Sequence, residues 1–441
     1  MSRKPPLHRG RLFTGVLHER RRDPLGFSIR CRDFGDVVAV KVLGFTVYTA
    51  NSPEAMKHIL VDNAQNYWKG KRAQVFKRVL GNGLLTAEGD QWLRSRRLAQ
   101  PAFHRERLAG LLVAMNEATS EMIGRWKNKR GPFEIFEEMA VLTLTIVGRT
   151  LFTTDVLGDA AHVSRSLAFL MEETLSFNPF KRLLPTKSER RYREAAEELD
   201  AIIRRIIEQR RRLESRPPDL LTMLMEARDV VDQSGMDDRQ LRDEALTFLL
   251  TGYETTASAL TWLWTLLDQS PEVSSRLSRE VADVLEGRTP RMEDLPRLGY
   301  LRATFDEALR LYPPAWLMVR QAHAADEVVG FALPKGALVV MSPYALHRAP
   351  EFWRDPMTFD PERFHSEQEV SERQKFVYLP FGAGKRMCIG SSFAVMVAQV
   401  IVAQVVQHFR VRVLPGQDLS CSPKVTLRPK GPIYVELERA S

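Results

Sequence analysis

Two kinds of hydrophobic pattern divide the chain, a helical one over most of its length and a strand-like one near both ends. Residues 37–50 alternate around Gly44, which predicts a β-hairpin. Ser52-Pro53 then supplies the N-cap and first position of a helix, and Ser270-Pro271 repeats this signal. From about 108 to 285 apolar positions recur at helical spacing. Turn signals interrupt this stretch at residues 178–179, 217–218 and 234–235.

The pattern changes after residue 314. Residues 316–345 contain short β-like runs, and residues 348–379 are proline-rich and irregular. A strongly apolar helix is expected to begin just after Cys388 and to run to about Phe409, and the alternating tail should add strands. No internal repeat or obvious linker interrupts the chain. We therefore predict one domain over residues 1–441, mainly α with a minor β-sheet.

The longest apolar stretch, Ala245 to Leu267, approaches the length of a membrane-spanning helix. Glu254 and several threonines interrupt it, and a charge at the centre of such a helix is costly in lipid. This favours a helix buried in protein. The first apolar stretch, Leu12 to Leu17, is too short for a signal peptide or an anchor. We expect a soluble, cytoplasmic chain without stable membrane insertion.

Composition adds further limits. Hydrophobic residues make up 44% and charged residues 27% of the 441 positions, which is enough apolar material for a large core. Cys31, Cys388 and Cys421 form no C-x-x-C pair, so a zinc site or a disulfide framework is disfavoured. The net charge of +9 gathers in runs typical of solvated helix faces. Since no nucleic-acid motif accompanies it, we expect no nucleic-acid binding, and an acidic protein is the better partner.

Residues 380–390, with the sequence PFGAGKRMCIG, form the most informative segment. Its glycines predict a loop that turns sharply or approaches another group closely. Cys388 lies at the start of a helix, where unpaired N–H groups and the dipole stabilise an anion, and Arg386 adds a cation. A thiolate held in this way can be a nucleophile, a redox thiol or a metal ligand. A lone cysteine in an apolar setting is, however, more often a small core residue.

Residues 249–256, with the sequence LLTGYETT, place a carboxylate and several hydroxyls where the periodicity predicts core. Buried polar groups need partners or a purpose. In one interpretation the threonines donate to backbone carbonyls and Glu254 escapes to the surface. In the other interpretation these residues carry chemistry.

The first of these segments resembles the haem-binding loop of the cytochrome P450 superfamily, F-x-x-G-x-R-x-C-x-G. It matches at Phe381, Gly384, Arg386, Cys388 and Gly390. The resemblance implies that Cys388 is the axial ligand of haem b and that Phe381 packs beside it. It implies that the two glycines bring the loop and helix close to the porphyrin, and that Arg386 pairs with a propionate. Thiolate ligation pushes electron density toward the iron and favours O–O cleavage.

The second segment resembles the oxygen-activation motif of the same family, [AG]-G-x-[DE]-T-[TS]. It matches at Gly252, Glu254, Thr255 and Thr256, whereas Thr251 departs from the usual small residue, and the resemblance implies that this departure alters the substrate space above the haem. The resemblance implies that Gly252 makes room for dioxygen and that Glu254 and Thr255 deliver protons through water. We therefore expect a monooxygenase. A peroxygenase, a haem-thiolate rearrangement enzyme and a haem-binding sensor or carrier are the alternatives.

Other motifs fit the same resemblance. Glu307 and Arg310 match the family's E-x-x-R helix and Arg363 its P-x-R-F segment, which implies a buried structural network. Most pairs with this spacing are surface salt bridges of little energetic value. Three residues are further implied as partners of the haem propionates, namely Trp92, Arg96 and Arg320.

The resemblance covers essentially the whole chain and implies a triangular, mainly helical haem domain. It implies that dioxygen and a small apolar substrate, such as a fatty acid or a terpenoid, are consumed. Because the chain ends soon after the haem helix, we expect no fused flavin or iron–sulfur domain, and electrons from a separate ferredoxin, flavodoxin or reductase. We also expect a monomer. Arg94 and Arg97, expected to be exposed, would join Lys385 in a docking face unless they are ordinary surface arginines. The residues expected to line an apolar pocket include Trp68, Phe76, Phe169, Met171 and Phe177.

Overall fold

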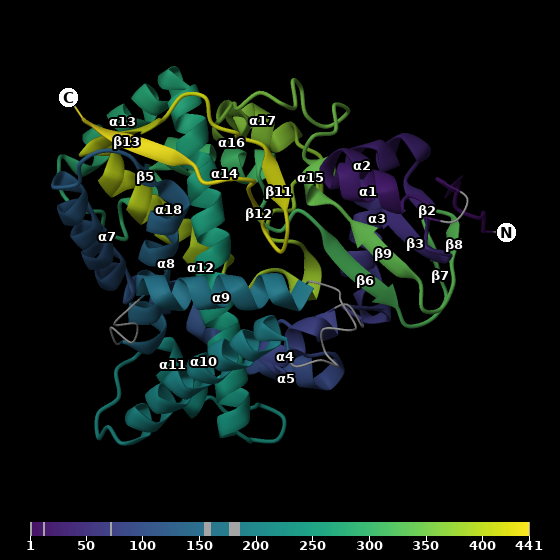
Figure 1. Cartoon of the computed structure of the whole chain (residues 1–441), viewed down its shortest axis with the longest axis horizontal. Helices are drawn as coiled ribbons and strands as arrows, with labels where there is room; N and C mark the ends of the chain where they lie inside the picture. Colours follow the sequence, from purple (N-terminus) through teal and green to yellow (C-terminus); the bar gives the residue numbers. More distant parts are fainter. Residues whose placement is uncertain (1, 12–13, 71–72, 154–159, 176–185, 441) are drawn as a thin grey trace. The chain divides into compact units, whose positions relative to one another are not determined.

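The computed structural model describes residues 2–11, 14–70, 73–153, 160–175 and 186–440 (Figure 1). Within this part, the contacts divide the chain into two compact units. The first unit takes its residues from 1–72, 303–389 and 421–428, and the second from 73–302, 390–420 and 429–441. Each unit is described by itself below. The expected single haem domain stays a prediction, whereas a mainly helical chain with a minor sheet is confirmed.

A six-stranded mixed sheet, in the order β1-β2-β3-β9-β6-β4, is the frame of the first unit. The predicted hairpin is confirmed, because β2 and β3 pair antiparallel with Val42 opposite Phe45. Its two-residue turn has positive φ at both Leu43 and Gly44, as a tight hairpin of this twist requires. The strands of the sheet are β1 (Leu7–His8), β2 (Val37–Val42), β3 (Phe45–Ala50), β4 (Tyr67–Trp68), β6 (Met318–Ala322) and β9 (Leu338–Met341).

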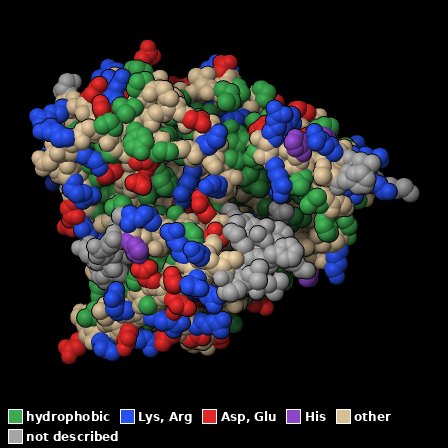
Figure 2. Space-filling view, viewed as in Figure 1, with side chains coloured by type: hydrophobic (Ala, Val, Ile, Leu, Met, Phe, Trp, Pro, Cys, Tyr) green, Lys and Arg blue, Asp and Glu red, His purple; other side chains and the backbone are tan. Residues whose placement is uncertain are grey.

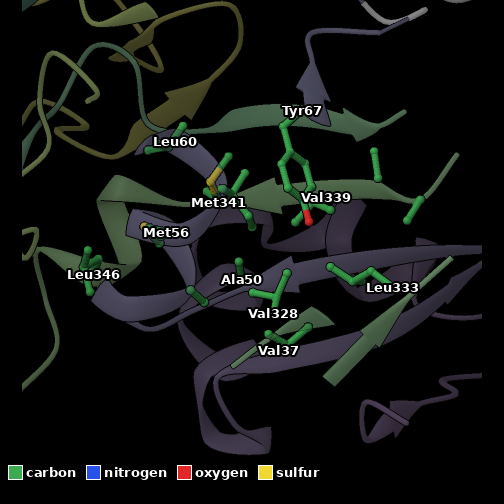
Figure 3. Packing of buried hydrophobic residues seen from close by; sticks show 14 of the residues in the cluster. Val37, Ala50, Met56, Leu60, Tyr67, Val328, Leu333, Val339, Met341 and Leu346 are labelled. Carbon is green, nitrogen blue, oxygen red and sulfur yellow. The ribbon is translucent and has the colours of Figure 1, made fainter. Parts of the chain in front are cut away.

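One face of this sheet packs into a hydrophobic cluster (Figure 3). Val37 and Ala50 of the hairpin meet Val339 and Met341 of β9, and Met56 of α3 (Pro53–Lys57) covers them. The helix α3 begins where the sequence predicts, with the Ser52 hydroxyl accepting from the Ala55 N–H at 3.3 Å. Burial of these apolar side chains fixes which face of each strand points inward.

The first unit also contains shorter elements. Leu379, at the start of the glycine-rich loop, belongs to the same hydrophobic cluster as the sheet. The sheet therefore supports the beginning of that loop. These elements are α1 (Leu17–Arg22), α2 (Pro24–Arg30), a π-helical turn (His58–Asp62), β7 (Asp326–Val328), β8 (Phe331–Leu333), α15 (Pro343–Leu346), α16 (Glu362–His365), α17 (Glu367–Glu372) and β11 (Cys421–Pro423). Two elements cross the boundaries between the units, α14 (Gly299–Leu311) and β12 (Leu427–Pro429).

The second unit is mostly helical. Its core helices are α7 (Leu112–Lys127), α8 (Ile135–Phe152), α12 (Asp238–Gln269) and α18 (Ser391–Val406), of which α8 contacts both α7 and α12 (Figure 1). The other helices are α4 (Lys77–Leu80), α5 (Gly89–Ala99), α6 (Arg105–Ala109), α9 (Ala160–Leu175), α10 (Lys187–Arg211), α11 (Leu220–Glu226) and α13 (Pro271–Leu285). A three-stranded antiparallel sheet joins β10 (Phe409–Val413), β13 (Tyr434–Arg439) and β5 (Phe133–Glu134).

Most of the predicted boundaries in this unit are confirmed. The chain leaves helical structure between α10 and α11 and again between α11 and α12, whereas residues 178–179 lie outside the described part. The helix α18 ends at Val406, three residues early, because Phe409 already opens β10. The stretch from Ala245 to Leu267 forms a buried helix, as expected. None of the described helices combines the length and apolar character that a membrane crossing requires.

Candidate functional site

The predicted site residues divide between the two units. Each group is built up below within its own unit. The first unit holds Arg320, Phe381, Gly384, Arg386 and Cys388, and the second holds Trp92, Arg96, Gly252, Glu254, Thr255 and Gly390.

The loop that carries Cys388 needs glycine at two positions. Gly382 and Gly384 have φ values of +72° and +69°, which other residues rarely adopt. A Cβ atom at Gly384 would lie 1.9 Å from the carbonyl oxygen of Leu60, in the π-helical turn. The prediction of sharp turning and close approach is therefore confirmed for this loop. The close neighbour of Gly384 is protein backbone, and the expected approach to a porphyrin stays a prediction.

Hydrogen bonds within the loop fix the backbone of Cys388. Its N–H donates to the carbonyl of Phe381 at 2.9 Å, and the Met387 N–H donates to the carbonyl of Gly384 at 3.0 Å. The helix α18 begins at Ser391 with Gly390 as its N-cap. Gly390 has an ordinary φ of −92°, so its conformation does not itself demand glycine. The expected effect of the helix end on the charge of Cys388 stays a prediction.

The three cysteines differ sharply in their surroundings. The side chain of Cys388 is exposed, whereas Cys31 is buried and Cys421 is half-buried. Burial raises the pKa of Cys31 to about 12 and that of Cys421 to about 11. Both of these residues therefore remain thiols at neutral pH. Cys388 is the cysteine whose position suits an external partner.

The helix α12 is buried from Asp243 to Leu267 at every position except three, which are Thr251, Gly252 and Thr255. Their spacing of one and four residues places them on one face of the helix. An otherwise enclosed helix is therefore accessible only at its predicted oxygen-activation motif. No periodicity in the sequence distinguishes this face from the rest of the core.

Hydrogen bonds on α12 confirm one part of the structural interpretation and contradict another. The Thr255 hydroxyl donates to the carbonyl of Thr251 at 2.7 Å, and the Thr256 hydroxyl donates to the carbonyl of Gly252 at 2.9 Å. Glu254 is only 4% exposed, so the idea that it escapes to the surface is wrong. The acid and the accessible hydroxyl of Thr255 lie on different faces of the helix.

Gly252 has a packing function in addition to any role in chemistry. A Cβ atom there would lie 3.1 Å from a methyl carbon of Val147 on α8, a tight contact. Glycine thus allows α8 and α12 to pack closely. Space for dioxygen beside Gly252 stays a prediction.

Trp92 and Arg96 lie one turn apart on α5, and both are half-buried. The expected exposure of Arg94 and Arg97 on the same helix is wrong. The Arg97 guanidinium forms an ion pair with the buried Asp229 at 2.7 Å. Arg94 donates to the side chains of Ser234 at 2.7 Å and Gln240 at 2.8 Å. These arginines therefore hold the loop before α12, and a docking role for them is weakened.

Arg320 and Arg386 were expected to pair with a haem propionate, and this role stays a prediction. Arg320 lies on β6, is 8% exposed and donates to the carbonyl of Val319 at 2.9 Å. Arg386 is half-buried and ends the short 3-10 turn Gly384–Arg386. Nothing in the described structure assigns either residue to a propionate.

Glu307, Arg310 and Arg363 form one buried network within the first unit. Arg310 donates from Nε and from a terminal nitrogen to the two carboxylate oxygens of Glu307, each at 2.7 Å. The Nε atom of Arg363 lies 3.4 Å from the same carboxylate. Arg310 also donates to the carbonyls of Pro356 at 2.7 Å and Thr358 at 3.1 Å. A side chain with this many partners fixes the irregular segment around it.

His347 is a residue that the sequence left without a role. Its ring is fully buried, and its two nitrogens meet the carbonyl of Arg310 at 3.2 Å and the N–H of Leu379 at 2.8 Å. Burial, followed by the nearby Arg310 guanidinium, lowers the pKa of His347 well below its usual range. Its partners lie more than thirty residues away in each direction, so no local pattern could have found them.

Glu244 was also missed by the sequence analysis. Its side chain is fully buried on α12, and one carboxylate oxygen accepts from the Leu84 N–H at 2.8 Å. Burial raises the pKa of Glu244 to about 7. The carboxyl group therefore changes protonation near neutral pH while it holds the segment before α5.

The apolar residues expected to line a pocket differ in their exposure. Trp68 is 38% exposed and stacks on His323 at 4.9 Å, whereas Met171 is buried and Phe169 is half-buried. Phe177 lies outside the described residues. Whether these side chains line a pocket stays a prediction.

Comparison with known proteins agrees with the motifs. The model of the cytochrome P450 family matches residues 5–437. The chain is 37% identical to cyclooctatin synthase of Streptomyces melanosporofaciens, over 92% of this chain and 89% of that relative. It is 36% identical to cyclooctat-9-en-7-ol 5-monooxygenase of the same organism, over 90% of this chain and 87% of the relative.

The fold has a solved counterpart. The haem domain of cytochrome P450DA superposes with a TM-score of 0.91 at 22% identity, over all of this chain and 99% of the other. The likeness of fold agrees with the match to the family model over nearly the whole chain. The chain therefore belongs to the cytochrome P450 family of haem-thiolate monooxygenases.

Proposed function

We propose that Cys388 supplies the axial thiolate to haem b in this chain. The observation that carries the proposal is the contrast between the exposed Cys388, on a loop with fixed backbone, and the two cysteines whose pKa burial raises. An exposed sulfur on a rigid loop fits a soft metal ligand, so the residues suit the cofactor. When bound, the haem supplies the binding and cleavage of dioxygen.

The residues proposed to hold the haem propionates are donors that suit carboxylates. The guanidinium groups of Arg96, Arg320 and Arg386 offer paired N–H donors, and the indole of Trp92 offers one more. Phe381 is proposed to pack beside the ligand. Gly384 and Gly390 are proposed to leave the porphyrin face unobstructed.

On α12 the proposed proton-handling groups are Thr255 and Glu254. Because the Thr255 hydroxyl gives its hydrogen to the carbonyl of Thr251, its oxygen is left to accept from water on the accessible face. Glu254, which is 4% exposed, is proposed to deliver protons together with Thr255. Because Gly252 has no side chain, it is proposed to leave space for dioxygen on this face of α12. The hydroxyl of Thr251 on the same face is expected to influence which substrates fit.

The substrate is proposed to be a cyclic terpenoid or a molecule of similar apolar character. One relative is named for the oxidation of cyclooctat-9-en-7-ol, and it aligns with 90% of this chain. Oxygen insertion into an apolar skeleton matches the class expected from the sequence. A fatty acid is the other apolar substrate that we expect to compete.

The chain uses dioxygen and an organic substrate, as the family does. We propose that a separate ferredoxin, flavodoxin or reductase supplies the electrons, and that the chain is a cytoplasmic monomer with one haem domain. Basic and acidic side chains are interspersed over the face shown in Figure 2. Nucleic-acid binding requires a continuous basic patch, so this mixed face argues against a nucleic-acid partner. Lys385, which is exposed within the loop that carries Cys388, is the basic residue that we propose for docking.

The decisive experiment supplies purified protein with a surrogate ferredoxin and reductase, NADPH, ¹⁸O₂ and a cyclic terpene alcohol. We expect a product carrying one labelled oxygen, and no product from Cys388→Ala. A parallel reaction with peroxide in place of NADPH tests the peroxygenase alternative. Product formed only with peroxide would contradict the monooxygenase proposal, and equal turnover of palmitic acid would contradict the terpenoid preference.

A further inference from the structure

His347 lies directly after α15, and both nitrogens of its buried ring meet main-chain groups. The Leu379 N–H can only donate, so Nε2 of His347 must accept its hydrogen. The hydrogen of the neutral ring therefore lies on Nδ1, which donates to the carbonyl of Arg310. One tautomer satisfies both partners, and the ring orientation is fixed by them.

The Nδ1 side anchors His347 to the buried ion network. Arg310 donates from a terminal nitrogen to the carbonyl of His347 at 2.7 Å, so the two residues bind each other twice. The same guanidinium holds both carboxylate oxygens of Glu307. The imidazole therefore projects from a cluster whose atoms have little freedom to move.

The Nε2 side leads to the proposed haem ligand. It binds the N–H of Leu379 at 2.8 Å, and the carbonyl of Leu379 accepts from the Gly382 N–H at 3.1 Å. The carbonyl of Phe381 then accepts from the N–H of Cys388 at 2.9 Å. A tight turn from Leu379 to Gly382 and a wider loop from Phe381 to Cys388 thus connect the histidine to the backbone of the cysteine. A displacement of Leu379 would be transmitted to the sulfur through these hydrogen bonds.

We infer that His347 is a positioning residue for the axial thiolate, acting through the hydrogen bond from Leu379 to its Nε2 atom. The inference rests on the proposed assignment of Cys388 as the haem ligand. The ring links the ion network around Arg310 to Leu379, at the start of the loop that carries Cys388. Its loss would free the start of the loop and let the sulfur leave the iron more readily.

A purely packing role is the competing explanation. The ring lies 5.3 Å from the ring of Tyr378 and 6.4 Å from that of Trp353, centre to centre, and fills space between elements. A space-filling role would depend on the volume of the side chain. A positioning role depends on which ring nitrogen keeps its partner.

Two amide substitutions separate these explanations because each copies one nitrogen of the ring. In His347→Gln the terminal amide oxygen reaches the position of Nε2 and can still accept from Leu379. In His347→Asn the shorter amide reaches only the position of Nδ1 and keeps the carbonyl of Arg310. The measurement is the rate at which the reduced, carbon monoxide-bound protein loses its red-shifted thiolate-type band at a fixed temperature.

We expect His347→Asn and His347→Phe to lose the band about tenfold faster than wild type, since the Leu379 N–H is left unpaired. We expect His347→Gln to stay within about twofold of wild type, since its N–H partner is kept. Val38→Ala, which trims a fully buried side chain of β2 in a hydrophobic cluster that does not contain Leu379, is the stability control. It should lower the thermal unfolding midpoint without changing the rate of band loss.

Three results would overturn the inference. One is equal behaviour of the Asn and Gln variants, and another is failure of both to fold. The third is band loss in Val38→Ala as fast as in His347→Asn at the same unfolding midpoint. Each would assign His347 to general stability. Absence of the thiolate-type band in wild type would instead refute the assignment of Cys388, so the two failures are distinguishable.

Discussion

The loop that carries Cys388 and the middle of α12 both contain residues that the sequence assigns to haem chemistry. The two regions are held in place by different kinds of contact. The loop is fixed from outside itself, by Leu60 at Gly384 and by His347 at Leu379. The hydroxyls of α12 are fixed by their own helix, through carbonyls one turn earlier. A substitution in a distant partner should therefore disturb the loop, whereas α12 should respond mainly to changes in its own residues.

Removal of Arg310 should give the largest effect. Arg310→Ala leaves the buried carboxylate of Glu307 with the Arg363 guanidinium and the Asp360 N–H, and it strips the carbonyl of His347 of its donor. We expect a loss of unfolding free energy of about 3–5 kcal/mol by urea denaturation, together with poor haem retention. Arg149→Ala, which breaks a more exposed ion pair with Glu121, is the control and should cost at most about 1 kcal/mol. Similar losses in both variants would contradict a special role for the buried network.

Glu244 predicts how stability depends on pH. Because burial raises its pKa to about 7, the folded chain holds this proton more tightly than the unfolded chain. Unfolding free energy should therefore fall as pH rises from the ordinary carboxyl range through about 7, by about 3 kcal/mol at most. Glu244→Gln should remove this fall and still accept from the Leu84 N–H.

Asp294 supplies a control of opposite sign. Donation from Arg288 holds its pKa at about 2, so its contribution is present at neutral pH and is lost as pH falls toward that value. Asp294→Asn should therefore flatten the acid side of the stability curve, while Glu244→Gln flattens the neutral side. An unchanged pH profile in Glu244→Gln would refute its raised pKa.

Gly384→Ala tests the external contact of the loop. The added Cβ atom would meet the Leu60 carbonyl at 1.9 Å, and the positive φ adds backbone strain. We expect a cost of about 2–3 kcal/mol and a weakened thiolate-type band. Gly336→Ala has a φ of +82° but open space around its Cβ position, so it isolates the strain and should cost about 1 kcal/mol. Equal costs would show that the contact with Leu60 is unimportant.

Among these substitutions, Thr255→Ala should have the smallest effect on the free energy of unfolding. It removes the hydroxyl on the accessible face of α12, and we expect the fraction of NADPH electrons recovered in product to fall about tenfold. Thr256→Ala, one residue along on the buried side, loses a similar backbone hydrogen bond and is the control. Uncoupling of the same size in both variants would mean that the accessible face has no special function.

How far the sequence predicted these features depends on how local their causes are. The positive φ values of the loop glycines and the back-bonding of the threonines are local features, and both were anticipated, whereas the approach of Leu60 to Gly384 comes from a distant segment. The contacts of His347 and the pairing of Arg97 with Asp229 join distant segments. No local pattern encodes them, so His347 was missed and Arg97 was expected to be exposed. The burial of Glu254 agrees with the helical periodicity, which predicts core at this position, and it excludes the alternative in which the side chain escapes to the surface.

The most direct test of the account is the carbon monoxide spectrum of the reduced protein and of two cysteine variants. We predict the red-shifted thiolate-type band in wild type and in Cys421→Ala, the half-buried control. We predict its complete loss in Cys388→Ala, with the chain still folded by circular dichroism. Retention of the band in Cys388→Ala, or its absence from the wild-type protein, would contradict the assignment of Cys388 as the haem ligand.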